Sequence, residues 1–297
     1  MKSQFKYLPF LLATPLLLSG TAHCEDFGPG FVFEIKKNQQ TVAYIVGSFH
    51  LLREEDHPLP SPVSKAFDNS GKIFFETDLD ARNTEDYQSA LVRQARLPEG
   101  HKLSDTLSPE TYALLVSHLQ KADLPEKTVA HYQPWMAAMM TAFLELHNAG
   151  YDIRSGVDAS LLQKSKSANR PLGYLEQPDA QIKALAWLSQ EDPEGLVRDT
   201  LAALPESQET IPALIEAWKK GNSAPISALL VEHLPADSLY HRVFLSERNK
   251  SWLPVMLEAI ELETTPPLFV VGAAHLLGKE NILDLLRAAG YDALPLK

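Results

Sequence analysis

The chain has 297 residues, of which 45% are hydrophobic and 22% are charged, and its formal net charge is −11. This composition is typical of a globular protein and excludes a disordered or collagen-like chain. The negative charge, which no run of Lys and Arg offsets, argues against nucleic acid as a partner. With a single Cys, no disulfide can form within the chain, so packing must hold the fold together.

The first 24 residues have the layout of a secretory signal peptide. Lys2 and Lys6 precede the apolar run 8–18, which small residues follow. The run is too short to span a bilayer. We expect cleavage after Ala22 or Cys24, which leaves an acidic protein, with no stable membrane span, in the periplasm or outside the cell. A lipid anchor on Cys24 and an uncleaved anchor helix are the alternatives.

Five short runs rich in β-branched and aromatic residues predict strands. Phe31–Lys36 and Thr41–Gly47 are separated by a polar stretch, which predicts a hairpin. The other three runs are Lys72–Thr77, Pro171–Leu175 and Pro267–Gly272. The last of them is wholly apolar, as expected for a buried central strand.

Helical patterns fill the segments between these runs. The sequence predicts helices at Val63–Asn69, after the Ser108 cap, at Trp135–Asn148, at Asp158–Ser167 and at Lys279–Ala289. Six prolines punctuate residues 179–263, so we expect several short helices there. The simplest organisation is a single domain over residues 25–297, with a helical insertion at about 84–150 and a helical stretch at about 179–263.

One seven-residue pattern occurs twice. Val46–Leu52 (VGSFHLL) and Val271–Leu277 (VGAAHLL) agree at five positions, and each follows a predicted strand. Each copy places a histidine, His50 or His275, three residues beyond a glycine. Because sites in α/β folds gather outside the carboxyl ends of strands, the two imidazoles are expected to bind one metal ion or to flank one substrate. The alternative is a pair of ordinary, partly buried histidines.

Glu76 follows the third predicted strand, directly after two phenylalanines. Two histidines and one carboxylate suit a divalent metal that keeps positions open for water and substrate. Such an ion lowers the pKa of bound water and polarises a carbonyl group. The HExxH, GxSxG, P-loop and GxGxxG motifs are absent from the sequence.

Four further residues are weaker candidates, because each has an ordinary structural explanation. Asp158 stands at a helix start, where Asp commonly caps, and Glu176 follows the fourth predicted strand. Arg248 and Asn249 lie in a helical stretch, where an arginine is usually a solvated ion-pair partner. Ser48 lies between Gly47 and His50, but it lacks the elbow that would activate a nucleophile.

Six blocks of the chain, taken in order, resemble the TraB/GumN family, which is related to the Tiki metalloproteases. The likeness runs from about Val32 to Leu294. The blocks are VGSFHLL, FFETDL, GVDASLL, PLGYLE, ERNKSW and VVGAAHLLGKENILDLLRAAGY.

This resemblance implies an α/β fold with a central mixed β-sheet, similar to erythromycin esterase and a haem-binding lipoprotein group, with helical insertions. It also implies a metal-dependent hydrolase activity. The residues that match the pattern of the family are His50, Glu76, Asp158, Glu176, Arg248, Asn249 and His275.

The leading hypothesis is an exported metal-dependent peptidase acting on a peptide or protein substrate. His50 and His275 would bind a divalent ion of the Mn, Co or Zn type, and Glu76 would complete the set or act as general base. Arg248 would stabilise the developing oxyanion. The alternative is a non-catalytic protein that binds or sequesters a peptide, a haem or a metal. A third interpretation is a metal-free esterase with His50 as its base.

Overall fold

The computed structural model describes residues 27–297, apart from the side chains of Leu188, Gln208 and His233. The predicted signal peptide therefore lies outside the described residues. The described chain divides into two compact units. The helical unit comprises residues 80–150 and 178–211, and the sheet unit comprises residues 27–79, 151–177 and 212–297. The prediction of a single domain over residues 25–297 stays a prediction.

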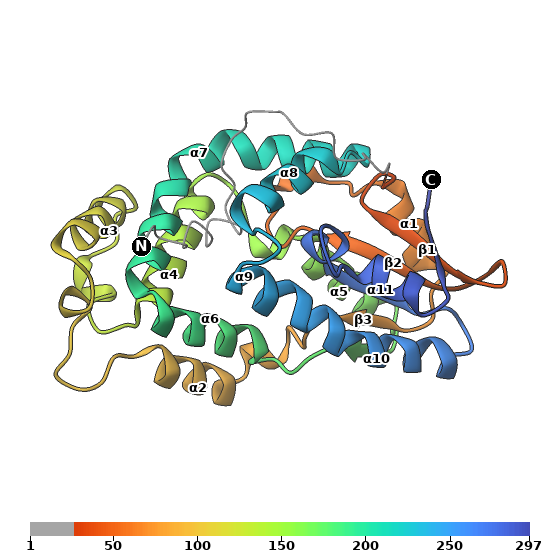
Figure 1. The fold of residues 1–297 in the computed structure, drawn as a ribbon, viewed down its shortest axis with the longest axis horizontal. Coiled ribbons are helices and arrows are strands. Elements are labelled where there is room, and N and C mark those ends of the chain that lie inside the picture. Colours follow the sequence, from red (N-terminus) through yellow and green to blue (C-terminus); the bar gives the residue numbers. More distant parts are fainter. Residues whose placement is uncertain (1–26) are drawn as a thin grey trace. The chain divides into compact units, whose positions relative to one another are not determined.

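A mixed sheet forms the centre of the sheet unit (Figure 1). It has six strands in the order β4-β3-β5-β2-β1-β6. This confirms the α/β class, whereas the likeness to erythromycin esterase stays a prediction. All five predicted strands are present, and the short edge strand β6 was not predicted. The strands are β1 (Val32–Lys37), β2 (Gln40–Ser48), β3 (Ile73–Phe75), β4 (Leu172–Tyr174), β5 (Leu268–Gly272) and β6 (Asp292–Pro295).

The four strands β4, β3, β5 and β2 run parallel to one another. In the register of the sheet, Ser48 at the end of β2 stands opposite Gly272 at the end of β5. On the other side of β5, Phe75 stands opposite Val270. The carboxyl ends of the parallel strands therefore meet at one edge of the sheet, where α/β folds build their sites.

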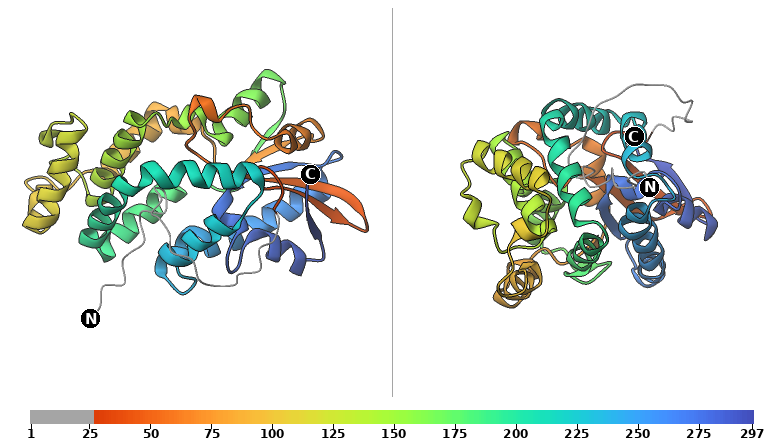
Figure 2. Two further views of the ribbon diagram at one scale, coloured as in Figure 1. Left: turned by 90° about the horizontal axis from the view of Figure 1, so that it is seen from above. Right: turned by 60° about the vertical axis from the view of Figure 1, so that its left-hand side comes forward.

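Helices cover both faces of this sheet, which explains why all five residues of β5 are buried. Helices α1 (Ser61–Asp68) and α5 (Val157–Ser167) lie on one side, and α10 (Glu247–Leu262) and α11 (Ile282–Ala288) lie on the other (Figure 2, left). The predicted helix at Lys279–Ala289 begins three residues later than expected. Asn281 caps it by accepting a hydrogen bond from the backbone N–H of Asp284 (2.9 Å).

The helical unit is built from segments that the sequence assigned to the insertion and to the first part of the helical stretch. Its α3 begins as expected, because the Ser108 hydroxyl accepts a hydrogen bond from the backbone N–H of Thr111 (3.2 Å). The helices of this unit are α2 (Glu85–Ala95), α3 (Pro109–Lys121), α4 (Pro134–Asn148), α6 (Ala180–Glu191) and the first part of α7 (Pro193–Lys220).

The expectation that the prolines of residues 179–263 separate short helices is wrong for α7 and α10. Helix α7 has 28 residues and contains Pro205 and Pro212, and α10 contains Pro254. A proline removes one backbone hydrogen bond, but the burial of an apolar helix face contributes more to helix stability than propensity does. Pro193 and Pro225 stand in first turns, as expected: Pro193 opens α7, and Pro225 lies in the first turn of α8 (Ala224–His233).

Across residues 27–297, none of the helices combines the length and the apolar character that crossing a bilayer requires.

Candidate active site

The two copies of the repeated pattern leave the sheet side by side, because their strands β2 and β5 are parallel neighbours. Glu76 follows β3, the other neighbour of β5, and its Oε1 accepts a hydrogen bond from the backbone N–H of Gly272 (2.6 Å). A methyl group built on Gly272 would lie 3.3 Å from Glu76 Oε1, 3.5 Å from His275 Cδ2 and 3.6 Å from His50 Nε2. The three predicted side chains therefore surround one point in front of Gly272.

His50 is held by a carboxylate on the first turn of α5. Its Nδ1 donates a hydrogen bond to Asp158 Oδ2 (2.8 Å), and the hydroxyl of Ser48 donates one to Asp158 Oδ1 (2.9 Å). The start of α5 is fixed by a hydrogen bond from the backbone N–H of Val157 to the carbonyl of Phe49 (2.9 Å). Gly156 permits this close approach, since any side chain there would overlap the carbonyl oxygen of His50.

His275 is held by two neighbours on α10. Its Nδ1 lies 2.6 Å from Asn249 Oδ1, and its Nε2 lies 3.1 Å from Arg248 Nη1. An arginine has no acceptor, so His275 Nε2 accepts this hydrogen bond and Nδ1 carries the proton. The imidazole of His275 is therefore the neutral Nδ1–H tautomer.

Arg248 uses all five of its N–H donors inside the protein. Nε and Nη2 donate to the two carboxylate oxygens of Glu176 (2.9 and 2.8 Å), and Nη2 also donates to Glu76 Oε2 (2.6 Å). Nη1 donates to the carbonyl of Phe244 (3.1 Å) and to His275. Glu176 is brought here by β4, which runs beside β3, and its backbone N–H donates to the carbonyl of Glu76 (2.8 Å).

The two histidines have opposite electrostatic surroundings. The negative charge of Asp158 raises the pKa of His50 to about 9, so its ring is cationic at neutral pH. Burial lowers the pKa of His275 to about 3, so its ring is neutral. Burial by itself would raise the pKa of Glu76, but its charged neighbours, Arg248 foremost, together with the hydrogen bond from the backbone N–H of Gly272, outweigh it and lower this pKa below its usual range.

The structure brings all seven predicted residues together within the sheet unit, although the role of each stays a prediction. His50 is the accessible member, with 43% of its side-chain surface exposed against 5% for His275. Sequence reasoning gave Ser48 little weight and missed Trp252, whose indole N–H donates to Glu176 Oε2 (3.1 Å). The signal for Trp252 was its spacing, four residues after Arg248 in a helical stretch.

A divalent ion shared by both histidines does not fit this arrangement. The donor types are suitable, and each Nδ1 is held by an oxygen, as is usual for a metal-binding histidine. However, His275 Nε2 already accepts from Arg248, and His275 turns Cδ2 toward the point in front of Gly272. Among the described residues, no group of three or more His, Cys, Asp or Glu side chains is arranged to hold a metal ion.

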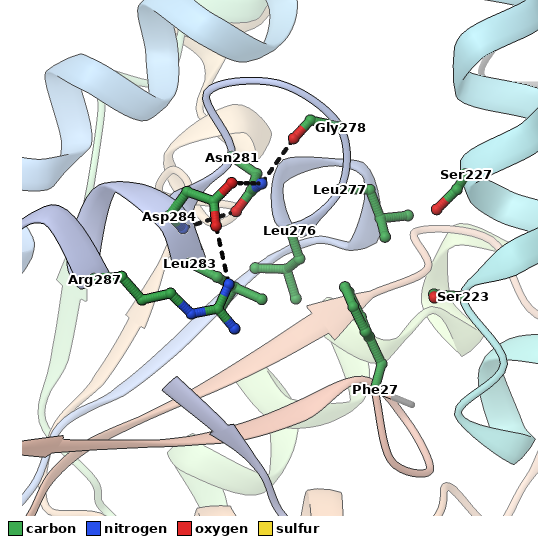
Figure 3. A pocket seen from close by; sticks show the side chains of 10 residues that line it. All are labelled: Phe27, Ser223, Ser227, Leu276, Leu277, Gly278, Asn281, Leu283, Asp284 and Arg287. Carbon is green, nitrogen blue, oxygen red and sulfur yellow. Dashed lines mark hydrogen bonds and ion pairs between the residues drawn. The ribbon is translucent and has the colours of Figure 1, made fainter. Parts of the chain in front are cut away.

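A separate pocket of about 200 Å³ is lined in part by the residues that follow His275 in the chain (Figure 3). Leu276 and Leu277 form part of its wall, together with Phe27, Ser227 and Asp284. Asp284 is already paired with Arg287 (2.9 Å). None of the seven site residues lines this cavity, so it is distinct from the candidate active site.

Comparisons with known proteins give one family model and several distant relatives. The sequence model of the TraB/PrgY/gumN family matches residues 31–294. The protein named "Uncharacterized protein YbaP" of Escherichia coli (strain K12) is 25% identical over 248 residues, which cover 82% of this chain and 87% of that protein. "Metalloprotease TIKI1" of Homo sapiens is 27% identical over 338 aligned positions, which cover 92% of this chain and 64% of that protein. No solved structure matches the chain.

Proposed function

This chain belongs to the TraB/PrgY/gumN family, and from that premise we propose that it is an exported hydrolase that cleaves peptide bonds. One observation carries the proposal. Glu76 Oε1 and His50 Nε2 lie 3.3 and 3.6 Å from the same point in front of Gly272. A carboxylate and an imidazole beside the same point can act as the base and the acid of general acid–base hydrolysis. The names of the Tiki relatives, which are metalloproteases, support a peptide substrate.

Glu76 is the general base of this proposal. Arg248 keeps its carboxylate ionised, and the backbone N–H of Gly272 fixes the orientation of Oε1. An ionised carboxylate in this position takes a proton from a water molecule as the water attacks the carbonyl carbon of the substrate.

His50 is the general acid. Asp158 holds Nδ1, so that Nε2 faces the reacting point, and its charge favours the protonated ring. The ring gives its Nε2 proton to the leaving amine. A positioned acid or base contributes about 10²–10⁴-fold to a hydrolysis rate. Because His50 is exposed, a substrate reaches the site from the side on which His50 lies.

Arg248 supplies a fixed positive charge to this proposal. All five of its N–H groups are engaged, so it stabilises developing negative charge through space, without a direct hydrogen bond. A direct oxyanion contact, as the sequence predicted, requires one of these donors to change partner.

The names of the Tiki relatives also support a metal-dependent version of the proposal, in which His50, His275 and Glu76 hold an ion of the Mn, Co or Zn type. That version requires Arg248 to release His275 Nε2. Chelation separates the two versions. Cleavage that stops on chelation and returns with one of these ions favours the metal-dependent version, and cleavage that survives chelation, with no metal in the purified protein, contradicts it.

The test of hydrolysis uses the purified chain and a library of quenched fluorescent random peptides. We expect the wild type to cleave the peptides and the rate to fall at least about 100-fold in His50→Ala and Glu76→Gln. We expect His101→Ala to cleave them as fast as the wild type. His101 is an exposed histidine in the helical unit, so it controls for the loss of an imidazole. Tight peptide retention without product would contradict the hydrolase and support the sequestering protein. Equal cleavage by all variants would contradict the assigned site.

Export is tested separately, by amino-terminal sequencing of the protein recovered from the periplasm or the medium. Cleavage after Ala22 gives a chain that begins at His23, and cleavage after Cys24 gives one that begins at Glu25. A protein that starts at Met1 and stays in the cytoplasm would contradict export.

A further inference from the structure

One face of α10 carries three residues that reach into the site. Arg248, Asn249 and Trp252 stand at positions i, i+1 and i+4, and residues three or four apart are neighbours on a helix surface. Arg248 and Asn249 hold His275, as described above. Trp252 is fully buried, with 0% of its surface exposed, and neither acid nor base chemistry uses it.

Trp252 contacts three members of the site at once. Its indole N–H donates to Glu176 Oε2 (3.1 Å), and its ring lies 4.5 Å from the guanidinium carbon of Arg248. The centroids of the Trp252 and His275 rings are 4.5 Å apart, and the angle between the ring planes is 40°. A tryptophan held in this way has both its polar N–H and its aromatic face engaged.

We propose that Trp252 is a positioning residue that fixes the Arg248–His275 pair for catalysis, an inference that rests on the proposed function. Glu176 Oε2 accepts from both Trp252 Nε1 and Arg248 Nε, so the indole orients the carboxylate that orients the guanidinium. The indole face then restricts the planes of the Arg248 guanidinium and the His275 imidazole to orientations in which Arg248 Nη1 can donate to His275 Nε2. Because Arg248 also holds Glu76, a shift of this pair is transmitted to the general base.

An apolar filler would not need these contacts, and two variants separate the alternatives. Trp252→Phe keeps an aromatic face against Arg248 and His275 but removes the N–H that Glu176 accepts. Trp252→Leu removes both. Trp135→Phe is the matched control, because Trp135 is also buried, belongs to the helical unit, and its indole nitrogen has no hydrogen-bond partner in the described chain.

The first readout does not depend on activity. Long-range ¹H–¹⁵N spectra of the full chain report the tautomer of His275 and the hydrogen bond at its Nε2. We expect the Nδ1–H tautomer with an acceptor Nε2 in the wild type and in Trp135→Phe, a displaced Nε2 resonance in Trp252→Phe, and a larger displacement in Trp252→Leu. Unchanged His275 signals in a folded Trp252→Phe variant would overturn the proposal, whatever the fate of Trp252→Leu.

The second readout is the rate of peptide cleavage. A misplacement of about 1 Å at a reacting group costs up to about 100-fold, so we expect kcat to fall about 10-fold in Trp252→Phe and about 100-fold in Trp252→Leu with KM little changed. A rise in KM at constant kcat would contradict positioning. If the wild type cleaves no peptide, the proposed function fails, and the His275 spectra still decide the role of Trp252.

Discussion

The two copies of the repeated pattern have similar sequences and lie at the same edge of the sheet, yet their histidines have different surroundings. Both follow parallel neighbouring strands, and both hold the histidine by an oxygen at Nδ1. In the first copy, that oxygen belongs to the carboxylate of Asp158, and the ring is accessible. In the second, it belongs to the amide of Asn249, and the ring is buried.

This difference separates what the strand provides from what the helices provide. The glycine-to-histidine spacing delivers each imidazole to the same edge of the sheet. The charge of each ring then depends on its surroundings. The carboxylate of Asp158 raises the pKa of His50 to about 9, whereas burial, with an amide instead of a carboxylate at Nδ1, lowers the pKa of His275 to about 3.

Replacing Asp158 with Asn would make the first copy resemble the second, and we expect the largest loss of activity from this change. The amide oxygen still accepts from His50 Nδ1, but without the negative charge the pKa of His50 falls from about 9 toward 6.5. At pH 8.5 an imidazole of pKa 6.5 is about 1% protonated, against about 76% for one of pKa about 9, so kcat there should fall by about 80-fold, with a smaller loss toward neutral pH. Histidine titration by NMR, together with peptide cleavage, measures both effects.

The same variant changes how stability depends on pH. Between pH 6.5 and about 9, folded wild-type protein binds more protons at His50 than the unfolded chain does, so stability falls as pH rises through this window. At His275 the folded state binds fewer protons, so stability falls as pH drops from 6.5 toward about 3. Urea unfolding should lose the alkaline slope in Asp158→Asn and keep the acid slope. An unchanged alkaline slope would contradict the role of Asp158.

The reverse change, Asn249→Asp, gives His275 a carboxylate partner. We expect the pKa of His275 to rise from about 3, and a protonated Nε2 can no longer accept from Arg248 Nη1. Losing a buried hydrogen bond to a charged group costs about 1.5–3 kcal/mol of unfolding free energy. NMR titration and urea unfolding test this expectation. Asn281→Asp is the control, because Asn281 is also buried and caps α11 without contacting either histidine; it should leave the His275 titration unchanged.

The glycines at the second position of the two copies offer a third comparison. A methyl group on Gly272 would point at His50, Glu76 and His275, whereas one on Gly47 would meet Leu276 at 2.8 Å. We therefore expect Gly272→Ala to lower kcat about 10-fold with little change in stability. Gly47→Ala should lower the free energy of unfolding by about 1–3 kcal/mol and leave the activity of the folded fraction intact. If Gly47→Ala lowered kcat and Gly272→Ala lowered only the free energy of unfolding, the reacting point would have to lie elsewhere.

The sequence predicted the strands and the two histidines because both depend on local patterns. Buried strands appear as continuous apolar runs, and the repeated spacing marks two strand ends. Strand β6 was missed because its four residues include a proline and alternate weakly at the edge of the sheet. Pro205 and Pro212 predicted breaks that the buried face of α7 overrides.

The partners of the histidines were harder to predict, because they are set by packing between distant segments. Asp158 is 108 residues from His50 in sequence, and a carboxylate in the first turn of a helix looks the same whether it caps the helix or binds a ring. Arg248 carries no local sign that five acceptors surround it. Trp252 was missed for the same reason, since its spacing from Arg248 gains meaning only once α10 lies against the ends of the strands.

The smallest effect is expected at the position where the two copies differ beside their strands, Ser48 in the first and Ala273 in the second. Ser48→Ala removes one donor from Asp158 Oδ1, while His50 still holds Oδ2. A hydrogen bond of this kind contributes about 1 kcal/mol, so kcat/KM should fall about 5-fold, with the pKa of His50 nearly unchanged. If Ser48→Ala instead abolished cleavage as fully as Asp158→Asn, the hydroxyl would have to act on the substrate itself, and the assignment of Glu76 as the base that activates water would be wrong.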